Sequence, residues 1–266
     1  KRRRFSDVRS PSAIDVVVPT YRRPRSLERS LAGIAEQTLP ASQVVVVARI
    51  DDHDSHEVVR SFTTRLRRLR LQTVTEPGVI AAMSAGVEAT ESPLVAFTDD
   101  DAVPRVDWLE RIVGYFADPS VAGVGGRDVI WHDGVSTPAN ASTVGKVQWF
   151  GRVIGNHHLG VGGPRDVDVL KGVNCAYRRE PLRAVGFDRR LRGSGAQVHW
   201  ELSLGLTLRR RGWRLVYDPA ILVDHYEADV RDSARVGLVG TAGEAVFDAS
   251  YNESLVLLDH LRGHRQ

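Results

Sequence analysis

The stretch VAFTDDDAVP, residues 95–104, runs from mostly apolar residues directly into three consecutive carboxylates, Asp99, Asp100 and Asp101. Like charges packed this closely repel each other and resist desolvation unless a cation, hydrogen-bond donors or open water compensates. One explanation is a solvated acidic turn before a helix that starts near Val106, because Asp is a good helix cap. The other is a buried strand that ends at a binding site.

The sequence before and around this stretch alternates apolar strands with amphipathic helices. Short runs rich in β-branched residues predict strands at 14–20, 43–50, 71–76 and 93–98. Apolar residues at helical spacing predict helices at 25–38, 58–69 and 79–89. Strands that are apolar on both faces and separated by helices imply an α/β fold with a doubly wound, mostly parallel sheet. In such a sheet, ligands bind at the carboxyl ends of the strands.

Polar clusters follow three of the predicted strands. They are Pro19-Thr20-Tyr21, Asp51-Asp52 and the Asp triplet. Alternate residues of an extended segment point the same way, so Asp99 and Asp101 are expected to face a ligand together while Asp100 points elsewhere. A nucleotide diphosphate held through Mn²⁺ or Mg²⁺ suits this pattern, because these cations share carboxylate and phosphate oxygens.

Composition sets the broad class of the protein. The chain has 266 residues, 42% of them hydrophobic, which is enough for one large domain or two small ones with real cores. The lone Cys175 excludes an intrachain disulfide and a cysteine-based metal cluster. The net charge is only +3, with basic runs at 1–4, 65–70 and 208–214 that suit solvated helix faces or anionic partners. No nucleic-acid partner is expected, because no basic-aromatic interleaving or binding motif is present.

The second half of the chain has a different character. Residues 127–168 are rich in Gly, Trp and His with little periodicity, as expected of loops over a site. A helix is predicted from about Trp200 to Arg211, and an amphipathic helix in the tail. We therefore divide the chain into a first half at 1–126, a second half at 127–228, and a C-terminal amphipathic tail at 229–266.

Three segments together resemble a known family. They are VVVPTYRRPRSLERSLAGIAEQTLP, EPGVIAAMSAGVEATESPLVAFTDDDAVP and LRRRGWRLVYDPAILVDH, which lie in the order and at the spacing seen in family 2 glycosyltransferases. The resemblance covers residues 14–228 and implies the GT-A fold with an acceptor-binding subdomain. It makes 1–126 the nucleotide-sugar-binding half and 127–228 the acceptor-binding and catalytic half. It implies an inverting, metal-dependent transfer of a sugar from a nucleotide-diphosphate donor, with a UDP-sugar expected, to a hydroxyl of a glycan or lipid-linked acceptor.

The resemblance also implies roles for the residues at the strand ends. Thr20, with its neighbours Pro19 and Tyr21, would contact the nucleoside. Asp52, Asp99 and Asp100 would complete that contact, with Asp52 chosen over Asp51 as the residue that reads the base. Asp101 and Asp99 would hold the cation, and His225 falls where many GT-A enzymes have a further metal ligand. A departure from the family is Met83-Ser84, where an Arg-Asn pair is common.

The general base is expected at the start of the helix near residue 200. Counting back from Arg211-Gly212-Trp213 aligns HWE (199–201) with the short acidic motif that supplies the base in the family. Glu201 is the only carboxylate in SGAQVHWELSLG and is the predicted base, and His199 is the rival. Trp200 would be a stacking wall beside the acceptor or a core residue. Further candidate contacts are Trp149, Asn156, His157, His158, Lys171 and Asn174.

Two other functions fit parts of the sequence. A sugar-1-phosphate nucleotidyltransferase shares the sheet type, but it requires a Gly-rich loop after the first strand, where this chain has PTYRRPRS. A non-catalytic carbohydrate-binding module would require a broken acidic site. We expect a cytoplasmic enzyme, with the basic N-terminus and the tail residues from Val246 to Leu258 holding it at the inner face of the plasma membrane.

Overall fold

The first half of the chain forms a parallel sheet. In this computed structural model, which describes residues 12–226 and 242–261, the first strands are β1 (Ile14–Thr20), β2 (Gln43–Arg49), β3 (Leu69–Val74) and β4 (Leu94–Phe97). They pair in parallel in the order β4-β1-β2-β3. The predicted parallel sheet is therefore confirmed.

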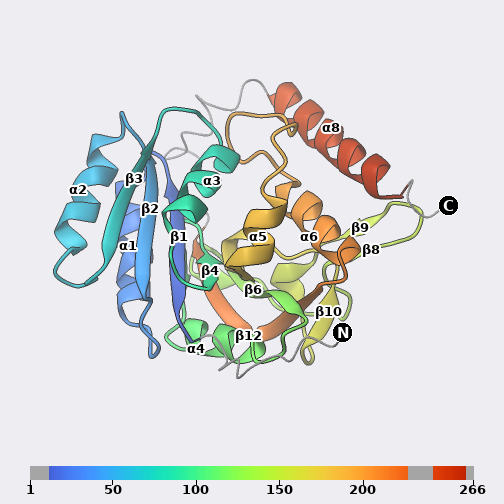
Figure 1. Cartoon of the computed structure of the whole chain (residues 1–266), viewed down its shortest axis with the longest axis horizontal. Helices are drawn as coiled ribbons and strands as arrows, with labels where there is room; N and C mark the ends of the chain where they lie inside the picture. The colour runs from blue at the N-terminus through green and yellow to red at the C-terminus, as the bar shows by residue number, and fades with distance from the viewer. Residues whose placement is uncertain (1–11, 227–241, 262–266) are drawn as a thin grey trace, which may run out of the picture.

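Alternation along each strand builds a core on both faces of the sheet. Val16 and Val18 of β1 pack into one core, and Val17 packs into the other. The first face is covered by α1 (Pro24–Ala35), α2 (His53–Phe62) and α4 (Trp108–Tyr115). The second is covered by α3 (Val79–Ala89), α5 (Arg179–Val185) and α6 (Trp200–Arg210) (Figure 1). Burial on both faces explains why the strands read as continuous apolar runs.

The predicted helix at 58–69 is wrong in its bounds. Helix α2 begins at His53, because the carboxylate of Asp52 accepts the backbone N–H of Ser55 and so caps its first turn. The helix ends at Phe62, and Leu69 already belongs to β3. Apolar residues after the helix that fit its period caused the error.

The second half extends the same sheet. Its main strands are β6 (Val121–His132), β10 (Arg165–Val167), β11 (Cys175–Arg178) and β12 (Arg214–Tyr226). Strand β11 is antiparallel to both β4 and β6, and β12 runs parallel to β6. Residues 127–132, which we expected to be irregular, belong to β6. The boundary that we drew between residues 126 and 127 therefore lies inside this strand. The two halves share one sheet.

Strand β12 carries a bulge. Its register against β6 shifts between Asp218 and Leu222, and Gly126 of β6 is so close that a Cβ there would collide with the carbonyl of Ile221. The side-chain amide of Asn174 donates to the carbonyls of Arg127 and Ile221 at 3.1 and 3.0 Å. Asn174 also accepts from the Trp108 indole and is fully buried. It therefore closes the bulge and does not reach an acceptor, contrary to our expectation.

Short elements complete the description. Strand β5 (Ala102–Pro104) pairs antiparallel with β12, and β7 (Val135–Ser136) pairs with β6. A separate hairpin is formed by β8 (Lys146–Val147) and β9 (Val153–Ile154). Two 3-10 turns are η1 (His157–Leu159) and η2 (Gly172–Asn174).

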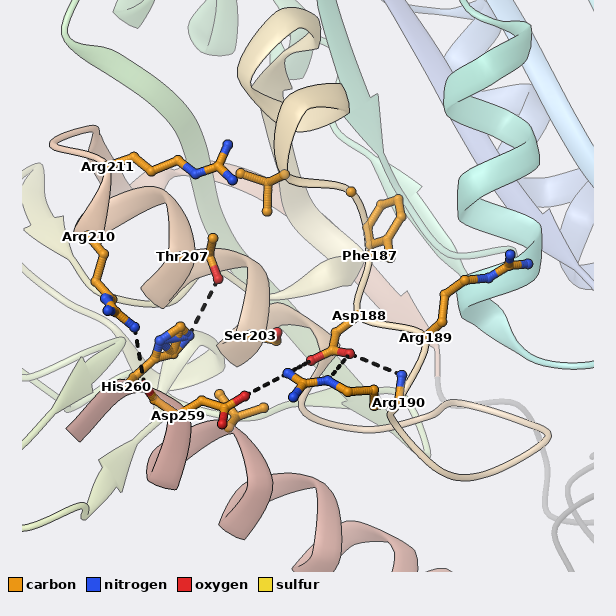
Figure 2. A pocket seen from close by; sticks show the side chains of 13 residues that line it. Phe187, Asp188, Arg189, Arg190, Ser203, Thr207, Arg210, Arg211, Asp259 and His260 are labelled. Carbon is orange, nitrogen blue, oxygen red and sulfur yellow. Dashed lines mark hydrogen bonds and ion pairs between the residues drawn. The ribbon is translucent and has the colours of Figure 1, made fainter. Parts of the chain in front are cut away.

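The tail forms helix α8 (Ala242–Leu261), which lies on α6 (Figure 1). Val256 is buried in the core, and a cavity of about 710 Å³ lies between α8, α6 and the segment after α5. At this cavity Arg190 bridges the carboxylates of Asp188 and Asp259, which ties the helix to the domain (Figure 2). The tail helix thus packs on the core as expected. None of the helices in the described ranges has the length and apolar character that crossing a bilayer requires. The basic residues 1–4 lie outside those ranges.

Asn252 on α8 is expected to be a main stabilising contact of the tail. It is fully buried, accepts the N–H of Arg192 at 2.7 Å, and donates to the carbonyls of Arg192 and Val198 at 3.0 and 3.1 Å. Asn252→Ala leaves these buried backbone groups without partners, so the free energy of unfolding should fall by about 2 kcal/mol or more. Chemical denaturation measures this. Ser254→Ala, at an exposed position of the same helix, is the control, and equal stability of both variants would contradict the assignment.

Candidate active site

The Asp triplet follows β4 and is held by partners from other elements. Asp100 accepts the hydroxyl of Thr20 at 2.7 Å and the guanidinium of Arg23 at 3.0 Å. The same guanidinium nitrogen donates to Asp101 at 3.1 Å. Asp100 and Asp101 are both buried, and α4 begins only at Trp108, so the solvated acidic turn is excluded. Asp100 points to Thr20 and Arg23, which gives it a positioning role.

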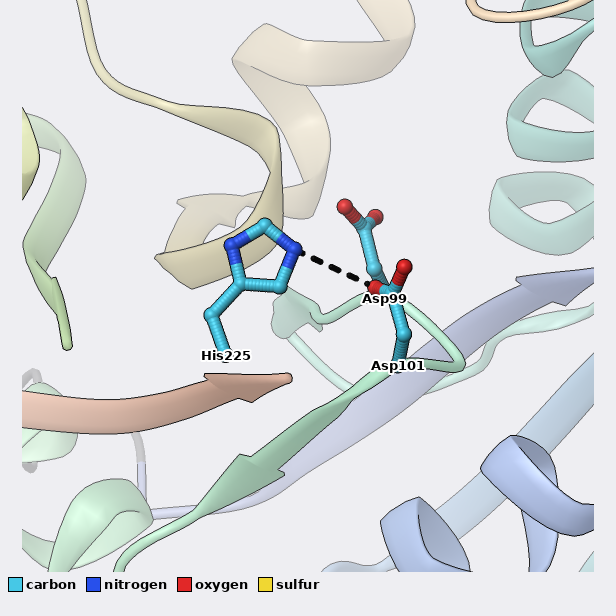
Figure 3. Close-up of side chains that lie close together, drawn as sticks. All are labelled: Asp99, Asp101 and His225. Carbon is cyan, nitrogen blue, oxygen red and sulfur yellow. Dashed lines mark ion pairs between the residues drawn. The ribbon is translucent and has the colours of Figure 1, made fainter. Parts of the chain in front are cut away.

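Asp99, Asp101 and His225 form a group that fits a divalent cation. One possible ligand atom from each lies within 4.8 Å of the others (Figure 3). The antiparallel pairing of β5 with β12 sets His225 opposite Ala102, beside Asp101. As a result, the imidazole Nε2 lies 3.3 Å from a carboxylate oxygen of Asp101. Two carboxylates and one imidazole are a donor set that suits Mn²⁺ well, and Mg²⁺ when most ligands are oxygens.

The carboxylates and the imidazole of this group shift each other's pKa values. Burial and the charge of Asp101 raise the pKa of Asp99 to about 7, against the opposing effect of His225. Burial lowers the pKa of His225, but the neighbouring carboxylates of Asp101 and Asp128, which favour the protonated ring, outweigh it and raise the value to about 10. A proton on His225 thus offsets carboxylate charge that a divalent cation would offset when bound.

Asp128, on β6, supports His225 from behind and was missed in the sequence. It is fully buried, forms an ion pair with Lys171, and has an oxygen 3.6 Å from the imidazole Nδ1. A carboxylate behind a ligating imidazole fixes the orientation of the ring. We missed Asp128 because GVGGRDV has no clear strand period. Lys171 pairs with Asp128, and its expected contact with the acceptor stays a prediction.

Glu201 lies at the start of α6, with its carboxylate against the backbone of Gly172. Its Oε1 accepts the N–H of Gly172 at 3.3 Å, and a Cβ on Gly172 would press on Trp200 and Glu201. Burial raises the pKa of Glu201, while its own backbone N–H, the N–H of Gly172 and the charge of Lys171 oppose the increase. The charge of Glu201 also contributes to the raised pKa of Asp99. The predicted base therefore lies close enough to the Asp triplet for electrostatic coupling.

The two residues before Glu201 have other surroundings. Trp200 is buried and packs edge-on against Phe187 at 5.5 Å between ring centroids, so it is a core residue and not an exposed stacking wall. His199 adopts φ +75° before the helix. Burial lowers the pKa of His199, and the charge that opposes this shift is that of Glu253 on α8.

The loop after β2 differs from our expectation for the nucleobase. Both oxygens of Asp52 accept backbone N–H groups, from Arg22 at 2.6 Å and from Ser55 at 3.3 Å, and the residue is buried. Asp51 is the accessible carboxylate and pairs with Arg22 at 3.3 Å. The guanidinium of Arg22 packs against the Tyr21 ring, with its Cζ 5.0 Å from the ring centroid. Pro19 lies within β1 opposite Val47.

Two further acceptor candidates, His157 and Trp149, have different surroundings. His157 is buried, its Nε2 lies 2.9 Å from the carbonyl of Val169, and burial lowers its pKa to about 4, so it is a structural residue. Trp149 is exposed at the tip of the β8–β9 hairpin. Met83, at the family's Arg-Asn position, is buried in the core, and Ser84 bonds to the carbonyl of Ile80 within α3.

The chain is similar to known glycosyltransferases. The chain is 28% identical over 191 residues to Glycosyltransferase AglE of Haloferax volcanii, which covers 70% of this chain and 59% of that protein. It is 31% identical over 166 residues to Pre-mycofactocin glycosyltransferase of Mycobacterium tuberculosis, covering 58% of this chain and 32% of the relative. The chain therefore matches less than two thirds of the length of either relative, 59% of the first and 32% of the second.

A solved structure has the same fold. Mannosyltransferase PcManGT from Pyrobaculum calidifontis, in complex with GDP-Man and Mn²⁺, matches with a TM-score of 0.60 over 96% of this chain and 73% of that one, at 20% identity. The predicted GT-A fold is confirmed by this match. The model of the family described as Glycosyltransferase like family 2 matches residues 11–235. Because that match covers most of the chain, the protein belongs to glycosyltransferase family 2.

Proposed function

We propose that this chain transfers a sugar from a nucleotide-diphosphate donor to an acceptor hydroxyl, with inversion at the anomeric carbon. The observation that carries the proposal is the group of Asp99, Asp101 and His225 at one edge of the sheet, with Glu201 close by. Family membership and the names of the relatives support the same reaction.

The roles of the residues follow from their chemistry. Asp99, Asp101 and His225 would hold Mn²⁺ or Mg²⁺, and the imidazole in the set favours Mn²⁺. When bound, the cation supplies electrostatic stabilisation of the diphosphate leaving group. Asp128 keeps the His225 ring oriented, and Arg23 keeps Asp100 and Asp101 in place. Glu201 takes the proton of the acceptor hydroxyl as the new bond forms.

The donor side is formed by the ends of β1 and β2. Tyr21 offers an aromatic face and Asp51 an accessible acceptor of hydrogen bonds, and both suit a nucleobase. A UDP-sugar remains our first expectation, and the GDP-Man bound to the structural neighbour makes a GDP-sugar the natural second donor to test. The acceptor would be a glycan or lipid-linked hydroxyl.

The competing functions predict different products. The loop after β1 has no glycine in PTYRRPRS, so few unobstructed backbone N–H groups are available to wrap a triphosphate, as a nucleotidyltransferase requires. A non-catalytic module would show donor binding without turnover.

A donor screen is expected to identify a stabilising nucleotide sugar. With Mn²⁺ present, the cognate donor at about 100 times its Kd should add roughly 2.7 kcal/mol to the stability of the folded state and raise Tm. Thermal unfolding with UDP- and GDP-sugars, each with and without EDTA, measures this, and release of the nucleoside diphosphate measures turnover. Pyrophosphate release from a nucleoside triphosphate and a sugar 1-phosphate would favour the nucleotidyltransferase instead. Binding without turnover of any acceptor would favour the module.

A further inference from the structure

The β8–β9 hairpin ends in a tight loop with two aromatic residues at its tip. The N–H of Gln148 bonds to the carbonyl of Arg152 at 2.9 Å, which closes a loop of Trp149, Phe150 and Gly151. Gly151 has φ +97°, as expected of the last residue in a three-residue hairpin loop. Glycine is needed there, but nothing in the loop geometry requires the two aromatic residues that precede it.

Both aromatic side chains are open to solvent. Trp149 is 88% exposed and Phe150 is 57% exposed, and the two rings pack edge to face at 5.5 Å between centroids. Turn positions usually take Pro, Asn, Asp, Ser or Gly, because these residues favour turn backbone or bond to it. Two large apolar side chains on a projecting turn therefore indicate a contact outside the domain.

The charges around the hairpin are positive. Residues 145–155 contain Lys146 and Arg152 and no carboxylate. At the base of the hairpin, the carboxylate of Asp168 is shared by Lys146 at 3.8 Å and Arg209 at 3.6 Å, and both cations also act on Asp166, so Lys146, Arg152 and Arg209 face two carboxylates. Cations are therefore in excess, and this excess suits an anionic surface.

We propose that Trp149 and Phe150 insert into the headgroup region of an anionic lipid bilayer. Two aromatic side chains offer roughly 150–250 Å² each, which falls short of the ~800 Å² per partner of a specific protein interface. A projecting tip also lacks the flat, complementary shape of such an interface. A bilayer interface requires no complementary partner surface, and it favours Trp in particular.

The position of the hairpin relates docking to the proposed function, on which this one step depends. The N–H of Val147 bonds to the carboxylate of Asp168 at 3.0 Å, and the N–H of Asp168 bonds to the carbonyl of Gly145 at 2.7 Å. The chain then continues to Lys171 and to Gly172, whose N–H contacts Glu201. The foot of the hairpin is thus bonded to the segment that leads to Gly172, which contacts the proposed general base Glu201. Docking of the hairpin would therefore bring a lipid-linked acceptor to this side of the molecule.

Vesicle binding by the chain itself tests the proposal. Sedimentation with vesicles of phosphatidylcholine, with and without phosphatidylglycerol, should show binding that requires the anionic lipid. The double variant Trp149→Ala, Phe150→Ala should bind roughly 10²-fold more weakly, because each buried aromatic side chain contributes transfer free energy worth about a tenfold factor in affinity. The comparison variant is Val246→Ala, Phe247→Ala, which removes an adjacent apolar pair of similar exposure, 67% and 58%, from α8 and so tests the rival membrane surface that we expected from the sequence.

Tryptophan fluorescence gives a second, direct measurement. Trp149 is the most exposed tryptophan in the described ranges, since Trp108 and Trp200 are buried and Trp131 and Trp213 are partly buried. Vesicles with brominated acyl chains should therefore quench Trp149, and Trp149→Phe should lose that quenching while keeping vesicle binding.

The outcomes separate the alternatives. Loss of binding in the α8 variant but not in the hairpin variant would overturn the proposal in favour of α8, and no binding of the parent chain would overturn it outright. A dimer of the parent chain that the hairpin variant converts to monomer would assign the tip to a second copy instead. Donor affinity, measured by calorimetry with Mn²⁺, should be equal in all of these variants, so failure of docking and failure of the proposed transferase function are distinguishable.

Discussion

Asp101→Asn is expected to remove the dependence of donor binding on Mn²⁺. The substitution preserves shape but replaces an anionic ligand by a neutral one, next to His225 and within 4.8 Å of the Asp99 ligand atom. Loss of an outer-shell partner of a metal ligand typically costs 10–100-fold in affinity, so loss of the ligand itself should cost about 10²-fold or more. Calorimetric titration of Mn²⁺, alone and with donor, measures the change.

The control for this variant is Asp224→Asn. Asp224 adjoins His225 on β12, but its carboxylate faces the opposite way and bonds to Arg105 and to the indole of Trp131. The Asp224→Asn variant should bind Mn²⁺ with the same affinity as the parent chain. Unchanged Mn²⁺ affinity in Asp101→Asn would refute the metal site.

We also expect Asp100→Asn to be disruptive, because Asp100 is the buried partner of Thr20 and Arg23. Its effect should appear mainly as lower stability.

Glu201→Gln is expected to lower the rate of transfer by about 10²-fold or more, the usual scale for loss of a general base. The amide retains an oxygen that can accept the N–H of Gly172, so donor and metal affinity should remain unchanged. Steady-state transfer at saturating donor and Mn²⁺, together with calorimetry, separates the two effects. Near-parental turnover in this variant would remove Glu201 from the mechanism.

The pH dependence gives an independent test of Glu201. Because burial raises its pKa, the unprotonated base is lost at a higher pH than for an exposed glutamate. The rate should therefore fall on the acid side above the ordinary range of glutamate, measured at saturating Mn²⁺, and Glu201→Gln should lack this limb. His199→Ala should retain it, since His199 interacts with Glu253 on α8. Disappearance of the limb only in His199→Ala would transfer the role to His199.

Much of the architecture could be predicted from local patterns. Runs such as QVVVVAR are apolar on both faces, which is possible in water only for strands covered by helices on both sides. The parallel strands then place Thr20, Asp52 and Asp99 at one edge, whatever the details of packing. The helix 79–89 was predicted to the residue, because its apolar run is closed on both sides by residues that do not continue a helix.

The sequence by itself determined the fold class, the carboxylate edge of the sheet and the family resemblance, because these depend on periodicity and on motifs close in the chain. Tertiary structure alone decided the partners of the site residues. Asp101 and His225 are brought together by β5–β12 pairing, and Asp128 reaches them from β6. Asn174 and Asp52 were misjudged, and the role of Trp200 was left open, for the same physical reason: a polar or aromatic residue can serve a ligand or the protein's own backbone and core. Only the contacts made by distant segments distinguish these uses.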